Sequence, residues 1–226
     1  MNQLMNTFFK LIKWPSAIAM LILFVPTITA DIWLGKSTFN NTFLLEFILP
    51  MTLVIIAYII FPNLKRSRFA VFEHEFTHMI AAIISLNSPK SMHISRDNGS
   101  FQHNGKKNWF IDLAPYIWPM YISLVICTQI ILQTFNPTIY QDTTGIFTLT
   151  LGALLGHRIV YNIYQIHPNQ SDFADAGHCF STIFLPTANL LAFGAIWAFV
   201  ANGLFGITQW LNILSQETHI FIQQLF

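Results

Sequence analysis

The residues RFAVFEHEFTHMIAAIISLN, at positions 68–87, combine an apolar run with two histidines and two glutamates. About 20 predominantly apolar residues are needed to cross a bilayer as a helix. Ionisable side chains inside such a run are costly and usually mark a functional site. We therefore expect residues 68–87 to form a membrane helix that carries the functional centre of the protein.

Within this run, His74-Glu75-Phe76-Thr77-His78 matches the pattern His-Glu-x-x-His. Residues four apart share one face of a helix, so His74 and His78 can both bind one zinc ion. Glu75 lies beside them, where it can accept a proton from a metal-bound water. The motif predicts a catalytic zinc site. The alternative is a hydrogen-bonded histidine pair that faces a wet cavity.

The whole chain has the composition of a membrane protein. Of its 226 residues, 54% are hydrophobic and only 9% are charged, against about 25% charged in average globular proteins. Its formal net charge of +1 provides no basic field for nucleic acid, so we expect no nucleic-acid partner. We expect a single membrane-embedded domain over 1–226, with its core at about 65–206 and an amphipathic tail at 207–226.

Apolar runs of spanning length predict an all-α, polytopic fold with about six transmembrane helices. The six runs are roughly 14–33, 43–62, 68–87, 109–134, 145–166 and 177–206. With six spans, each side of the membrane carries five lysines and arginines. The positive-inside rule therefore gives no orientation.

A catalytic zinc normally has a third protein ligand and one open position. Asp172 and Asp175, which are three residues apart and can face the same way, are two candidates. Asp172 can instead cap a helix. His157, near the centre of 145–166, is the third candidate, although a lone histidine there is more often packed and hydrogen-bonded. The residue types alone leave all three open.

A polar stretch after the motif predicts a short β-hairpin at 92–103. Its centre is Asn98-Gly99, a pair that favours primed hairpin turns because both residues tolerate positive φ. An exposed hairpin edge beside a catalytic centre can pair with an extended substrate by strand addition.

On these residues the chain resembles the site-2 protease class of intramembrane zinc metallopeptidases, and in particular its small bacterial members. The first motif is the specific one, and weaker matches follow it over roughly 65–195. The matching residues are His74-Glu75-Phe76-Thr77-His78, Leu113-Ala114-Pro115-Tyr116, Gln170-Ser171-Asp172, Gly177 and Phe180-Ser181. The resemblance implies that His74, His78 and Asp172 bind Zn²⁺ and that Glu75 is catalytic.

Two departures from the family pattern affect the later part of the chain. The family's Asp-Gly-Gly-His-like motif is echoed by Asp175-Ala176-Gly177-His178, with alanine in place of the first glycine. The family also has one span between its histidine and aspartate helices, whereas two runs, 109–134 and 145–166, lie between them here. Pro115 and Pro119 make 109–134 the run that we expect to be irregular.

The resulting expectation is a multi-pass zinc metalloendopeptidase that hydrolyses peptide bonds within or next to membrane-spanning segments. Its partners are then a membrane-protein or peptide substrate and the lipid bilayer, and the resemblance implies the bacterial inner membrane. One alternative is another type of membrane zinc hydrolase, whose third ligand would be a later glutamate, and only Glu217 follows the motif. A second is a non-catalytic transporter or binding protein with a structural metal site.

Overall fold

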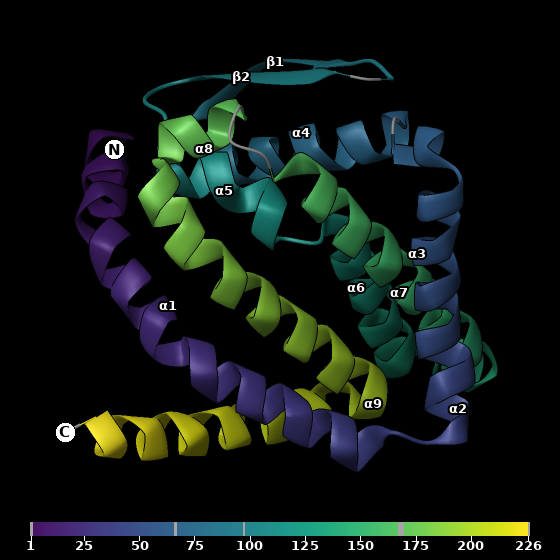
Figure 1. The fold of residues 1–226 in the computed structure, drawn as a ribbon. Coiled ribbons are helices and arrows are strands. Elements are labelled where there is room, and N and C mark those ends of the chain that lie inside the picture. The colour runs from purple at the N-terminus through teal and green to yellow at the C-terminus, as the bar shows by residue number, and fades with distance from the viewer. Residues whose placement is uncertain (1, 66, 97, 167–169, 226) are drawn as a thin grey trace.

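The computed structural model describes residues 2–65, 67–96, 98–166 and 170–225. This part of the chain is mostly helical, with one small two-stranded sheet (Figure 1). In chain order the elements are α1 (Asn2–Thr38), α2 (Asn41–Phe43), the π-helix η1 (Leu44–Ile48), α3 (Leu49–Ile60), the 3₁₀ helix η2 (Pro62–Lys65), α4 (Arg68–Ile84), β1 (Ser88–Ile94), β2 (Gly99–Asn104), α5 (Trp109–Ile117), α6 (Met120–Phe135), α7 (Pro137–Gln165), α8 (Ser171–Ala176) and α9 (His178–Leu225).

Within the described ranges, three helices, α1, α7 and α9, are long and apolar enough to cross a membrane. The count becomes five if each of two bent pairs is one span: η1–α3 with η2–α4, bent by 106°, and α5 with α6, bent by 68°. The prediction of six spans is therefore not confirmed. In particular, α4 lies nearly across the direction of α3 (Figure 1), so 68–87 is one arm of a bent segment.

The break in 109–134 was expected from its prolines and is confirmed. The chain leaves α5 at Trp118 in an extended conformation, and Pro119 then precedes the first residue of α6. Pro119 has no backbone N–H to donate and fixes its own φ, which favours a helix boundary. The bend places α5 beneath α8 and beside α4, at one end of the molecule (Figure 1).

Helices α7 and α3 pack closely because two glycines of α7 face the backbone of the preceding segment. A Cβ added at Gly152 would lie 3.1 Å from the Cα of Phe47, and one at Gly156 would lie 3.2 Å from the Cα of Met51. Small residues four apart allow such close approach of helices in membranes.

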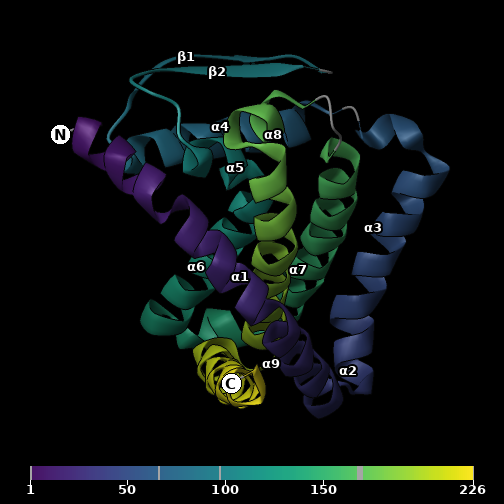
Figure 2. The ribbon, with the colours of Figure 1, turned by 60° about the vertical axis from the view of Figure 1, so that its left-hand side comes forward.

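Helix α9 packs along α1 and then turns back (Figure 2). The turn is at Asn202 and Gly203, where Gly203 has φ 58° and ψ −145°, a backbone conformation that is essentially restricted to glycine. Beyond it, the expected tail at 207–226 is helical through Leu225. Its Trp210 and Leu214 are buried against Ala30 and Leu34 of α1.

The predicted hairpin is present, and its strands extend beyond 92–103. Ile94 pairs with Gly99, and next to this pair Ser95 N–H donates to the Asn98 carbonyl at 2.9 Å. The sequence predicts a turn at Asp97-Asn98-Gly99; Asp97 lies outside the described residues, and Gly99 belongs to β2 and not to the turn. This position needs glycine for another reason, which is its close contact with Glu75 and Val71 of α4.

Candidate metal centre

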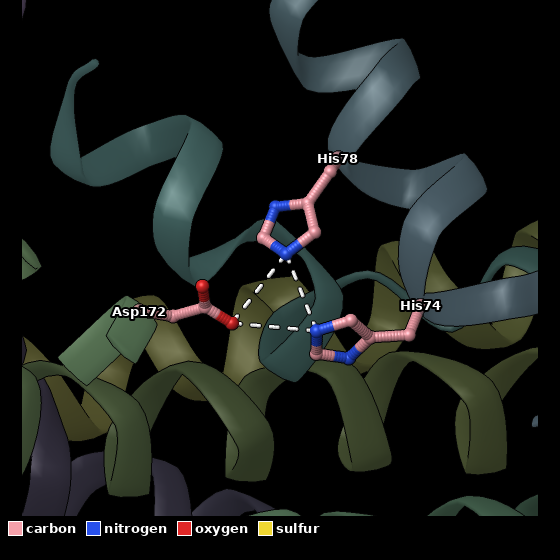
Figure 3. Close-up of side chains that lie close together, drawn as sticks. All are labelled: His74, His78 and Asp172. Atoms are coloured by element: carbon pink, nitrogen blue, oxygen red, sulfur yellow. Dashed lines mark hydrogen bonds and ion pairs between the residues drawn. The ribbon is translucent and has the colours of Figure 1, made fainter. Parts of the chain in front are cut away.

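The His-Glu-x-x-His motif lies on α4, whose first turn is capped by Ser67. The Ser67 hydroxyl accepts a hydrogen bond from Ala70 N–H at 3.2 Å, so the helix begins at Arg68. His74 and His78, one turn apart, are only 8% and 9% exposed. Their Nε2 atoms lie 3.2 Å apart, so the two rings are directed at the same point (Figure 3).

The broken helix orients His78. Its Nδ1 lies 2.7 Å from the carbonyl oxygen of Ile111 in α5. A carbonyl only accepts hydrogen bonds, so Nδ1 carries the hydrogen and Nε2 faces His74. Metal-binding histidines almost always donate their second ring N–H in this way, because the bond fixes the ring and its tautomer.

Helix α8 supplies Asp172 to the same point. Its Oδ2 lies 3.3 Å from His74 Nε2 and 3.4 Å from His78 Nε2 (Figure 3). The Tyr116 hydroxyl donates to that oxygen at 2.9 Å. Asp172 does not cap α8, because the residue before the helix is Gln170 and no side chain caps its N-terminus.

The three atoms form a nearly regular triangle with edges of 3.2, 3.3 and 3.4 Å. Zinc binds imidazole nitrogen and carboxylate oxygen at about 2.0–2.2 Å, which gives a tetrahedron with edges of about 3.3–3.5 Å. The triangle thus has the size of one face of a zinc coordination tetrahedron. Two imidazoles and one carboxylate are also a donor set of catalytic zinc sites, which leave a fourth position open. The residues therefore fit the ion.

The charge of Asp172 suits this role. Burial alone would raise the pKa of its carboxyl group, but hydrogen bonds with the His74 and His78 rings outweigh that effect and hold the pKa below its usual range. The carboxylate is therefore ionised at neutral pH. A metal bound between the three side chains would replace the protons that they otherwise share.

The other two candidate ligands lie elsewhere. Asp175 pairs with Lys107, whose Nζ is 2.6 Å from its Oδ2. His157 hydrogen-bonds through Nδ1 to the Tyr58 hydroxyl, and its Nε2 is 3.9 Å from the carboxylate of Glu73. Among the described residues, the structure brings only Asp172 of the three candidates together with His74 and His78.

Glu75 is 7% exposed and lies directly under the hairpin. A Cβ added at Gly99 would lie 2.5 Å from Glu75 Cγ and 2.7 Å from Val71 Cγ1, well inside van der Waals contact. Glycine is thus required at position 99 because β2 passes close to α4 there, and not because of the turn. The hairpin covers the side chain that the motif assigns to proton transfer.

Glu73 is a residue whose role the sequence did not predict. It is 4% exposed, and its Oε1 accepts a hydrogen bond from Tyr121 N–H at 3.2 Å, in the first turn of α6. The residue before α6 is Pro119, which offers no capping side chain. A carboxylate at a helix N-terminus satisfies free N–H groups and the helix dipole. Glu73 therefore holds the broken helix against α4.

A cavity of about 590 Å³ lies next to the centre. It is bounded mainly by apolar side chains of α7 and α9, and by Ile117 and Phe173, the neighbours of Tyr116 and Asp172. Two polar groups at its wall, Asn162 and Asn189, hydrogen-bond to each other at 2.9 Å, as expected for interhelical contacts.

Comparison of the chain with protein-family models, curated proteins and solved structures finds no match. The residues of this centre and their geometry are therefore what indicates a function.

Proposed function

We propose that the protein is an intramembrane zinc metalloendopeptidase of the site-2 protease class. The observation that carries the proposal is the triangle of His74, His78 and Asp172, which has the edge lengths and the donor atoms of a catalytic zinc site. The three side chains come from α4 and α8, which are nearly 100 residues apart in the sequence.

His74, His78 and Asp172 would hold the ion. Zinc held there would supply a Lewis acid that could lower the pKa of a water molecule and polarise a substrate carbonyl. The Ile111 carbonyl and the Tyr116 hydroxyl keep two of the ligand side chains in place through hydrogen bonds. Second contacts of this type normally affect metal affinity strongly.

Glu75 is the general base in this proposal. Its carboxylate accepts the proton of the attacking water and later donates a proton to the nitrogen of the leaving amine as the peptide C–N bond breaks. Its burial under Gly99 and beside Val71 supports the role, because a base enclosed by protein is held in one position and is shielded from bulk water.

The surroundings of the centre are suited to an apolar, extended substrate. The adjoining cavity is lined mostly by aliphatic and aromatic side chains, which suit side chains of a membrane segment. A peptide bond in an intact helix is shielded, so the substrate must unwind before hydrolysis. The hairpin over α4 has outer strand edges that can take up the hydrogen bonds of an unwound segment.

The proposal is tested with Glu75→Gln. The variant removes the base but no ligand, so zinc per chain should stay at the wild-type value while hydrolysis falls to background. Wild type and variant are expressed in the same cells, and membrane proteins that are shortened only with wild type are identified by mass spectrometry. Hydrolysis that persists in Glu75→Gln would contradict the mechanism.

The same variant separates the two alternative functions. A transporter or binding protein with a structural metal site has no chemical need for Glu75, so its function would survive Glu75→Gln. A hydrolase with a later glutamate as third ligand is not favoured, because Glu217 belongs to the segment of α9 beyond the turn, at the other end of the molecule from α4 (Figure 1).

A further inference from the structure

The bends in the chain gather most of its cationic side chains at the metal-centre end. The start of α1, η2, the start of α4, the hairpin and the link to α5 all lie there (Figures 1 and 2). These segments carry Lys10, Lys13, Arg68, Lys90, Arg96, Lys106 and Lys107. Of the other described cationic residues, Lys36 lies near the opposite end of α1, and Arg158 is buried in α7.

Four of these lysines surround one hollow. It has a volume of about 580 Å³ and lies where α1, the link before α5 and α8 meet. Lys10 and Lys13 line it from α1, and Lys106 and Lys107 line it from the link. Asp175 of α8 is the one acidic residue among its described lining residues.

The hollow therefore has a positive charge that the protein does not neutralise. Lys107 pairs with Asp175. Lys10, Lys13 and Lys106 form no ion pair with a carboxylate among the described residues, and Lys10 and Lys106 are exposed. Lys13 lies 5.2 Å from the centre of the Phe180 ring, a cation–π distance that fixes its position but adds no negative charge.

The position of the hollow along α1 points to a membrane surface. Lys10 and Lys13 directly precede the apolar stretch 14–33, and Trp14, at its first residue, is 52% exposed. Lysine and tryptophan at the end of an apolar helix are typical of the interface, where lipid phosphates lie. Trp109 forms part of the hollow and is anchored by its Nε1–H, which donates to the Phe9 carbonyl at 2.7 Å.

We propose that this hollow binds the phosphate of an anionic phospholipid headgroup. By the positive-inside rule, the lysine-rich end of the molecule faces the cytoplasm, and the cytoplasmic leaflet holds anionic lipids. Basic pockets between membrane helices on that side are suited to phosphate headgroups. The proposal does not depend on hydrolysis at the metal centre.

A bound phosphate has a consequence for the centre. It would bridge lysines of α1 and of the link to α5 beside Asp175 of α8, the helix that also carries Asp172. The headgroup would then stabilise the corner of the molecule from which this side chain reaches His74 and His78.

The test compares Lys10→Gln/Lys106→Gln with Lys36→Gln/Lys90→Gln. Both pairs remove two exposed lysines, but only the first pair lines the hollow. Full-length protein is titrated with phosphatidylglycerol and with phosphatidylcholine, and bound lipid is counted by native mass spectrometry. A lysine near an anionic lipid surface contributes about fivefold in affinity, so the first pair should weaken phosphatidylglycerol binding about 30-fold. The second pair leaves all four lysines of the hollow in place, and only its Lys90 lies at the same end of the molecule, so it should weaken binding by no more than about fivefold.

Two further measurements distinguish a lipid phosphate from free phosphate and test the charge of the hollow. Inorganic phosphate, added to protein in phosphatidylcholine nanodiscs, should not bind at concentrations that saturate with phosphatidylglycerol. Asp175→Asn, which removes the acidic residue of the hollow, should tighten phosphatidylglycerol binding about fivefold. Equal binding by both lysine pairs, equal affinity for phosphatidylcholine, or equally tight binding of inorganic phosphate would each overturn the proposal.

Discussion

Gly99→Ala should push the hairpin away from the metal centre. The added Cβ would lie 2.5 Å from Glu75 Cγ and 2.7 Å from Val71 Cγ1. Carbon atoms pack at about 3.5–4.0 Å, so the strand or the side chains must move by about 1 Å. Overpacking of this size costs about 1–3 kcal/mol. Since β1 is exposed almost throughout, we expect the hairpin to yield before α4 does.

Amide hydrogen exchange over the hairpin measures this cost. A loss of 1–3 kcal/mol corresponds to about a 5- to 150-fold loss of protection in residues 88–104, with zinc content unchanged. Gly145→Ala is the control, because its Cβ would meet Glu46 Oε1 at an ordinary 3.6 Å. Glu75→Ala removes one of the clashing side chains and should restore much of the protection in Gly99→Ala. Unchanged protection in Gly99→Ala would refute the placement of β2 over Glu75.

Three further outcomes follow from the fold. Gly152→Ala should lower the free energy of unfolding in denaturant by about 1–3 kcal/mol, because its Cβ would meet the Phe47 backbone, whereas Gly145→Ala, whose Cβ has room in the same helix, should raise it by about 0.5–1 kcal/mol. Asn162→Leu and Asn189→Leu should each lower the free energy of unfolding by about 0.6–2 kcal/mol. The double variant should lose less than the sum of the two, because the two asparagines share one hydrogen bond. Additive losses would contradict that shared bond. A phosphatase fused to the C-terminus should be active outside the cytoplasm and one fused to the N-terminus inactive; the reverse pattern would contradict the orientation.

Much of the centre could be predicted from sequence because its signals are local. The spacing of His74 and His78 fixes their common face, and Pro115 and Pro119 indicate the break in 109–134, which the structure contains. The choice of Asp172 over Asp175 and His157 was not decided by residue type. It depends on where α8 lies relative to α4, and this is set by contacts between distant segments.

The features that the sequence did not predict are all of this non-local kind. A count of apolar runs treats 43–62 and 68–87 as two separate spans. In the structure, the helices of these two runs, α3 and α4, meet at a bend of 106° and count together as at most one span. That bend changes which end of the molecule carries the lysines. Glu73 accepts a hydrogen bond from the first turn of α6, 48 residues later in the sequence. Gly99 is needed because the side chain of Glu75 lies beneath it.

The most direct test of the metal centre is the zinc content of the purified protein, measured by elemental mass spectrometry for wild type, Asp172→Ala, Asp175→Ala and His157→Ala. The geometry predicts about one zinc per chain in wild type. Because Asp172 is the only one of the three substituted residues that lies at the centre, the protein should lose its zinc only in Asp172→Ala. Loss of zinc in Asp175→Ala or His157→Ala with retention in Asp172→Ala, or no zinc in wild type after reconstitution, would contradict the account.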